Sequence, residues 1–502
     1  MKKYIYIAGI CMSALLATSC EDFLTVSSPD KLTSDSFWRD EADAEAGMAA
    51  AYSQLEYYID TWEFAEVKWP VEAYREDIID IGNDAMNYQN WVELYNFSYT
   101  NGNSQFNSYW SNNYRGISFA NQVMEKVAGI ENMDATKLSQ MVCEAKFLRA
   151  YYHLKLLLNW KEIVIRDKYI TDPAELDKAL SSRTECWDFI VDDLKNAAAG
   201  LPSSYDSDNL GRATSGAAYS YLGFAYLTRA YEEPEKKTEY LNNALSAFGN
   251  VRGYELETDF GSMFDGTNKN CKESIFELQT SMSSANGANY RTQLQYWIAT
   301  AELGGWDEIL PNKILVDEYK KEGQVATTGL YDTRFYHTLF TDCDYYNDGT
   351  GKVFGYDYNE LFDTDRPAFR KLLPATADAF WEDYCAINVP LMRYANVLLM
   401  MAEAHNELGN PANAIPLINQ VRAAHGNMPA MTGISQNEVQ AQIEHERMLE
   451  FPLENWRWYD LRRWGKLSQA LNAVNRTSFS QENNAFFPTP LTEINSNALI
   501  SE

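Results

Sequence analysis

The chain has 502 residues and is strongly acidic, with 71 Asp and Glu against 42 Lys and Arg and a net charge of −29. This charge excludes nucleic acid as a ligand, because phosphate binding requires a basic surface, and it argues against anionic lipids and strongly acidic polymers. Hydrophobic residues make up 46% of the chain, enough for a large core, and 33 tyrosines and 13 tryptophans are more ring surface than a helical core needs. We therefore expect some of the rings to face a ligand.

Residues 1–19 have the features of a lipoprotein signal peptide. Lys2 and Lys3 form a positive start, and the apolar run 5–16 is too short to span a membrane. Small residues then lead to Cys20, although alanine stands where a lipobox usually has leucine. We expect Cys20 to carry the lipid anchor, so that the mature protein is attached to a membrane without crossing it. The alternative is a secreted protein in which this cysteine is incidental.

After a polar leader over 20–34, the pattern predicts a single domain over 35–502 that is built mainly of α-helices. Helical periodicity and capping signals fall on 36–58, 105–127, 138–160, 184–199, 214–230, 235–248, 390–408, 414–424 and 442–449. In the pair 214–230 and 235–248, the small residues Gly223 and Ala244 would let two antiparallel helices approach closely, as in a tetratricopeptide repeat. A second such pair is expected between 390 and 424. These features predict an all-α, tetratricopeptide-type scaffold.

Two long segments, about 60–103 and 252–388, lack this periodicity. Both are rich in Trp, Tyr, Asn and Gly, and we interpret them as structured loops inserted into the scaffold, with one strand at 274–279. Long irregular segments within a compact domain are usually functional. We therefore expect the ligand to bind at these inserts.

The remaining motifs predict no catalytic residues, no metal and no cofactor. The spacing of the mature cysteines, Cys143, Cys186, Cys271, Cys343 and Cys385, supports neither a zinc site nor a disulfide framework, although one or two disulfides remain open. The five histidines form no metal-binding pair at helical spacing, and 342–349 departs from the ligand spacing of a calcium loop. The arginines between the rings of 456–464 are expected to pair with the excess carboxylates.

The chain resembles the SusD/RagB family of surface lipoproteins along its whole length. The matching segments, in chain order, are CEDFL (20–24), WSNNYRGISFAN (110–121), EAKFLRAYY (144–152), ESIFELQ (273–279), VPLMRYANVLLMMAEA (389–404), INQVR (418–422), ERMLEF (446–451), YDLRRW (459–464) and FPTP (487–490). The resemblance implies a scaffold of four helix pairs with a ligand-binding insert. It also implies an outer-membrane position facing the cell exterior and a TonB-dependent transporter as partner. The family offers no catalytic residue to carry over.

A glycan is the ligand that the inserts favour. Sugar rings have an apolar face that stacks on Trp or Tyr and a hydroxyl rim that short polar side chains can satisfy. The predicted glycan-binding residues are Trp69, Tyr74, Asn87, Trp91, Asn289, Tyr290, Gln293, Tyr296, Trp297 and Trp306. Among them we favour Trp91, Tyr290, Tyr296 and Trp297, because they lie among Asn, Gln and Gly. Trp297→Ala is expected to lower affinity without unfolding the protein.

Two other functions remain open on the sequence alone. Tetratricopeptide surfaces often hold peptides, so the protein could be a peptide-binding lid of the same kind of transporter. An acidic, aromatic-rich exported chain could also be a glycoside hydrolase, which would need two carboxylates at a defined separation across a cleft. Neither is favoured over a non-catalytic glycan-binding lipoprotein.

Overall fold

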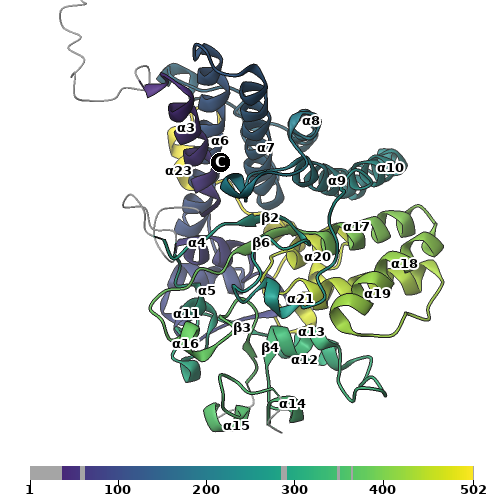
Figure 1. The fold of residues 1–502 in the computed structure, drawn as a ribbon. Helices are drawn as coiled ribbons and strands as arrows, with labels where there is room; N and C mark the ends of the chain where they lie inside the picture. Colours follow the sequence, from purple (N-terminus) through teal and green to yellow (C-terminus); the bar gives the residue numbers. More distant parts are fainter. Residues whose placement is uncertain (1–36, 57–62, 284–290, 348–350, 363–365, 501–502) are drawn as a thin grey trace, which may run out of the picture.

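The computed structural model describes residues 37–56, 63–283, 291–347, 351–362 and 366–500. Its long helices are α3 (Glu41–Ser53), α6 (Ser104–Lys126), α7 (Ala135–Asn159), α8 (Arg183–Gly200), α9 (Ser215–Glu232), α10 (Lys237–Phe248), α17 (Tyr394–Glu407), α18 (Pro411–Val421) and α19 (Gln436–Glu450). From α3 to α10 each packs against the next in this series, and α17 packs on α10, α18 and α19. The pairs α3–α6, α7–α8, α9–α10 and α17–α18 form the scaffold (Figure 1). The predicted all-α, tetratricopeptide-type fold is confirmed.

Capping residues and small residues explain why these helices begin and approach one another where they do. Ser182 and Glu185 form a capping box at the start of α8, and Ser435 and Glu438 form another at the start of α19. Gly223 on α9 faces the ring of Phe248 on α10, and a Cβ placed there would lie 2.3 Å from it. The close seam predicted between these two helices is therefore present.

Short strands connect the scaffold to the irregular segments. Strand β2 (Ser274–Leu278) pairs antiparallel with β6 (Val389–Arg393), β1 (Ile79–Ile81) with β3 (Ile309–Pro311), and β4 (Leu339–Phe340) with β5 (Ala368–Phe369). The strand at 274–279 was predicted, but the helix predicted from residue 390 is wrong at its start. All five residues of β6 are buried, so their apolar run continues into α17 without a break in the sequence pattern.

The first insert contains more regular structure than the predicted loop. Residues 63–96 include α4 (Glu63–Glu72), β1 and α5 (Gln89–Asn96). These elements are short, and Pro70 lies inside α4, which hides the helical period. In the described part of the second insert the α-helices are short: α11 (Leu294–Ile298), α12 (Lys313–Lys320), α13 (Thr333–Thr338), α14 (Asp344–Asn347), α15 (Tyr358–Leu361) and α16 (Ala377–Phe380).

The C-terminal segment returns along the scaffold through α20 (Arg457–Arg463), α21 (Leu467–Ala473), α22 (Gln481–Asn484) and α23 (Leu491–Ser496). Its bulky rings Trp456, Trp458 and Tyr459 are buried. Among the described residues, Cys143, Cys186, Cys271, Cys343 and Cys385 are free thiols. Within the described ranges, no helix is both long and apolar enough to cross a membrane.

Candidate functional site

Four of the predicted glycan-binding rings are core residues. Trp69, Tyr74, Trp91 and Trp297 are at most 3% exposed. Trp297 lies at the centre of this buried ring cluster, with ring centroids 5.5 Å from Trp69, 6.4 Å from Tyr74 and 5.4 Å from Trp91. Because their faces pack on one another, these four rings do not present a stacking surface to a sugar. The cluster instead joins α4, α5 and α11, which come from both inserts.

Other rings of the same region reach the surface above this cluster. Tyr296 and Trp306 are half-buried and stack with centroids 6.0 Å apart and planes 28° apart. Trp381 is 54% exposed and lies at the end of α16, next to Phe380, which contacts Tyr296 at 6.2 Å. We call Tyr296, Trp306 and Trp381 the aromatic platform. Trp381 was not predicted; the only sequence signal was a lone tryptophan in a segment rich in Ala and Asp.

Backbone contacts hold the platform in place. The Trp306 N–H donates to the Tyr296 carbonyl (2.7 Å), and Thr292 and Cys385 exchange backbone hydrogen bonds of 2.8 and 2.7 Å. Gly304 has φ +79°, and a Cβ there would lie 3.0 Å from the Trp381 ring, so glycine allows the turn and the ring to meet. Figure 1 shows α11 and α16 side by side below the scaffold. The platform is thus a fixed surface built from two segments far apart in sequence.

Polar groups surround the platform rings. The hydroxyl of Tyr296 donates to the Glu382 carbonyl (3.0 Å), and Gln293 Nε2 donates to the Asp383 carbonyl (3.3 Å). Burial and the neighbouring Asp383 raise the pKa of Tyr296, so its hydroxyl stays protonated at neutral pH. The side chains of Asp378, Glu382 and Asp383 are exposed. The site therefore offers stacking rings, hydroxyl and amide groups, and acidic oxygens, which match a sugar's apolar face and its hydroxyl rim.

The remaining predicted residues are not part of the aromatic platform, and some of them fall outside the residues that the structure describes. Asn87 is exposed on the turn before α5 and donates to Asp84 Oδ1 (2.9 Å). Its neighbour Tyr88 is 43% exposed and stacks on Trp91 at 4.0 Å, which extends ring surface toward α5. Asn289, Tyr290 and the predicted anchor Cys20 fall outside the described residues.

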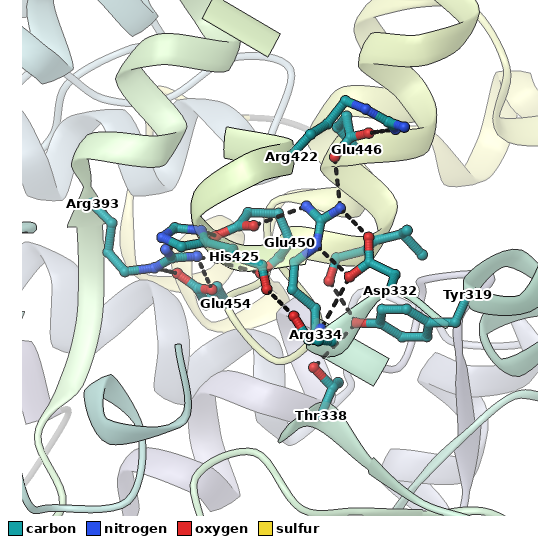
Figure 2. A network of polar contacts seen from close by, with 12 residues as sticks. Tyr319, Asp332, Arg334, Thr338, Arg393, Arg422, His425, Glu446, Glu450 and Glu454 are labelled. Atoms are coloured by element: carbon teal, nitrogen blue, oxygen red, sulfur yellow. Dashed lines mark hydrogen bonds and ion pairs between the residues drawn. The ribbon is translucent and has the colours of Figure 1, made fainter. Parts of the chain in front are cut away.

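A buried group with metal-like spacing lies within a network of polar contacts around His425 and Glu450 (Figure 2). His425 contacts Glu450 through Nδ1 (2.9 Å) and Glu273 through Nε2 (3.0 Å), and all three are buried. Arg393 Nη1 donates to both carboxylates, at 2.6 and 2.8 Å. Burial disfavours a charged imidazole, but Glu450 and Glu273 outweigh this and raise the pKa of His425 to about 9. The imidazolium and the guanidinium already neutralise the carboxylates, so the group fits an ion-pair network rather than a metal centre.

The same network continues through other arginines. Arg334 pairs with Asp332 (2.6 Å), Glu446 (2.7 Å) and Glu450 (3.0 Å), all fully buried. Arg422 bridges Glu446 and Glu322, where His445 completes a second metal-like group, and the guanidiniums of Arg422 and Arg334 pair with its carboxylates. Most of the sequence segments that matched the family pattern near the C-terminus therefore contribute to this network. They specify the fold rather than the ligand.

A helical-repeat scaffold that carries an aromatic platform with one exposed and two half-buried rings is the architecture of a binding protein. Family models for the SusD family and for starch-binding proteins associating with the outer membrane match residues 272–501 and 22–227, respectively. The chain belongs to the SusD/RagB family.

Relatives of known sequence or structure span nearly the whole chain. SusD-like protein P2 of Formosa agariphila is 28% identical over 99% of both chains. A crystal structure of a SusD superfamily protein from Bacteroides vulgatus superposes with a TM-score of 0.80 at 26% identity, covering 93% of this chain and 99% of that one. A laminarin-binding SusD-like protein superposes with a TM-score of 0.74 at 24% identity, covering 91% and 98%. The superposition on the laminarin-binding protein shows that the two chains share a fold.

Proposed function

We propose that this protein binds a glycan on the aromatic platform without catalysis and delivers it to a partner TonB-dependent outer-membrane transporter. The observation that carries the proposal is the fixed set of the exposed Trp381 and the half-buried Tyr296 and Trp306, with polar groups at its edge. The laminarin-binding relative supports a saccharide as the ligand class. The acidic surface supports a ligand without phosphate or sulfate groups.

The protein is proposed to be a lipoprotein of the outer membrane that faces the cell exterior. The predicted anchor is Cys20, and the family description includes association with the outer membrane. Replacement of Cys20 by alanine should move the protein from the membrane fraction to the soluble fraction and abolish labelling by a radioactive fatty acid. A variant that stays in the outer membrane and keeps the label would contradict the anchor.

The binding proposal is tested by calorimetry on the purified protein with neutral, uronate-bearing and sulfated oligosaccharides and with a peptide mixture. Binding of one glycan class with no new reducing ends over hours is expected. Trp306→Ala/Trp381→Ala should lower that affinity at least about tenfold, in line with the loss of two stacking contacts. Tyr169→Ala, a ring outside the platform, is the matched control and should bind normally.

Other outcomes would redirect the assignment. Heat from the peptides alone would favour the peptide-binding lid, and release of reducing ends would favour the hydrolase. Equal affinities of the platform variant and the wild type would remove the platform as the binding surface. Co-purification of a TonB-dependent transporter with the tagged protein from outer membranes is the expected result for the delivery step, and its absence from crosslinked membranes would contradict that step.

A further inference from the structure

A cavity lies beside the platform, and the residues that line it were not predicted to bind a ligand. It has a volume of about 540 Å³ and opens between the 259–265 turn, β4, the 352–355 turn and the 370–377 segment. Phe264, Phe340 and Phe354 supply its apolar walls. This volume is in the range of small-ligand sites, which combine apolar walls with a few fixed polar groups.

Arg370 is the principal donor of this cavity. Its Nη1 donates to the Tyr336 carbonyl (2.7 Å) and to the Tyr346 hydroxyl (3.4 Å), and its guanidinium lies 6.0 Å from the Phe340 ring centroid. Within the described ranges it forms no ion pair, whereas Arg334 and Arg393 each pair with several buried carboxylates. A half-buried arginine that lines a cavity and pairs with no carboxylate has donors left for a ligand.

Acceptors lie on the rim of the same cavity. Asp259 and Asp265 both line it, and each uses one carboxylate oxygen to accept a backbone N–H of its own turn, from Ser262 (3.3 Å) and Thr267 (2.9 Å). Lys352 on the rim is already paired with Asp357. Burial lowers the pKa of His337 to about 4, so this lining residue is a neutral imidazole that can both donate and accept.

This combination favours a neutral hydroxylated ligand over an anion. The third cationic lining residue, Lys371, is paired with Glu454 (2.7 Å). The two aspartates offset the charge of Arg370 and would repel a carboxylate or sulfate. A sugar unit, in contrast, can use arginine as donor and aspartate as acceptor, and it can contact the half-buried ring of Phe354 with its apolar face. Phe354 stacks on Phe380 (4.7 Å, 23°), and Phe380 contacts Tyr296 of the platform. Phe380 therefore links the cavity wall at Phe354 to the platform at Tyr296.

We propose that this cavity is a second saccharide subsite, which holds one neutral sugar unit, a chain end or a branch, of the glycan that lies on the platform. The inference rests on the proposed function. Under this inference the protein recognises a terminal or branching sugar unit in addition to the ring faces of the glycan chain. A ligand that fills both sites must bend or branch around Phe380.

The test uses the full-length protein, ligand-observed nuclear magnetic resonance and calorimetry, with neutral linear and branched oligosaccharides and their uronate-bearing counterparts as probes. In the Trp306→Ala/Trp381→Ala background, weak binding of the neutral probes should remain. Adding Asp259→Asn or Arg370→Met should reduce it at least about tenfold, the loss expected for a hydrogen bond to a charged group. Asp259 is exposed, so its variant should fold normally, and Arg252→Met, an exposed arginine outside this cavity, is the control.

The outcomes separate the two proposals. Wild-type binding that disappears entirely in the platform variant would overturn the second subsite and leave the proposed function intact. Residual binding whose affinity is unchanged by both Asp259→Asn and Arg370→Met would also overturn the second subsite. A response of Arg370→Met that is confined to uronate-bearing probes would overturn the neutral-sugar assignment. Failure of the wild type to bind any saccharide would overturn the subsite and the proposed function together.

Discussion

At the scale of single residues, Trp297 and Trp306 are a matched pair of rings with different expected roles. Trp297 is 2% exposed in the buried ring cluster, so we expect Trp297→Ala to destabilise the protein by about 3–5 kcal/mol. Trp306 is half-buried on the platform, so Trp306→Ala should cost little stability and mainly lower glycan affinity. Urea denaturation and calorimetry on both variants check this. A stable Trp297→Ala variant with weakened binding would restore the original prediction for this ring.

The reason that sequence reasoning selected Trp297 is physical. Its neighbours in sequence include Gln293 and Gln295, and such a polar setting usually indicates a surface ring. The partners that bury it, Trp69, Tyr74 and Trp91, belong to the other insert and meet it only in the folded chain. Tyr296, one position earlier on the short helix α11, points to the surface instead. Burial in an irregular segment depends on long-range contacts that no local pattern records.

At the scale of secondary-structure elements, the buried ion-pair network joins the short π-helix after α18 (Arg422–Gly426) to α19, β2 and β6. His425 in that π-helix contacts Glu450 at the end of α19 and Glu273 just before β2. Its folded-state pKa of about 9 lies above the ordinary value near 6.5. The charged imidazole therefore contributes stability that is complete below about pH 6.5 and is lost as the pH rises through 9.

We expect the destabilisation caused by His425→Gln to be larger at pH 6 than at pH 10, by roughly 3 kcal/mol at most. Chemical denaturation over this range measures it. His405→Gln on α17 is the control, because burial lowers the pKa of His405, a shift opposite in direction to that of His425. Parallel stability curves for wild type and His425→Gln would show that the imidazole is neutral in the fold.

The helices of the scaffold were predictable because their signals are local: an apolar stripe, capping boxes at α8 and α19, and a small residue at the seam between α9 and α10. The start of α17 was not predictable, because all residues of β6 are buried and their apolar run has the same sequence pattern as a further turn of the helix. Pairing with β2, more than a hundred residues earlier, decides the difference. Elements defined by a distant partner are the ones that sequence patterns misassign.

At the scale of the whole molecule, the scaffold stabilises the fold and the inserts carry the candidate binding site. The stacked helices and the ion-pair network fix the fold, while α5, α11 and α16 from the two inserts converge at one end of the molecule (Figure 1). The sequence located the inserts, and thereby the region of the site, from the loss of periodicity. It could not select the platform rings, because the contact between the segments around residues 296 and 381 forms only in the folded protein.

The charge of the whole molecule predicts which glycans it can hold. The net charge is −29, and Asp378, Glu382 and Asp383 lie exposed beside the platform. Neutral glycans should bind with an affinity that changes little between about 0.02 M and about 0.5 M salt, whereas sulfated or uronate-bearing glycans should bind weakly and improve as salt screens the repulsion. The variant Asp378→Asn/Glu382→Gln/Asp383→Asn should raise the affinity for anionic glycans and leave the affinity for neutral glycans unchanged, so that the difference between the two affinities becomes smaller. Calorimetry at both salt concentrations tests this, and tight binding of an anionic glycan at low salt would show that the ligand reaches a surface other than the acidic platform.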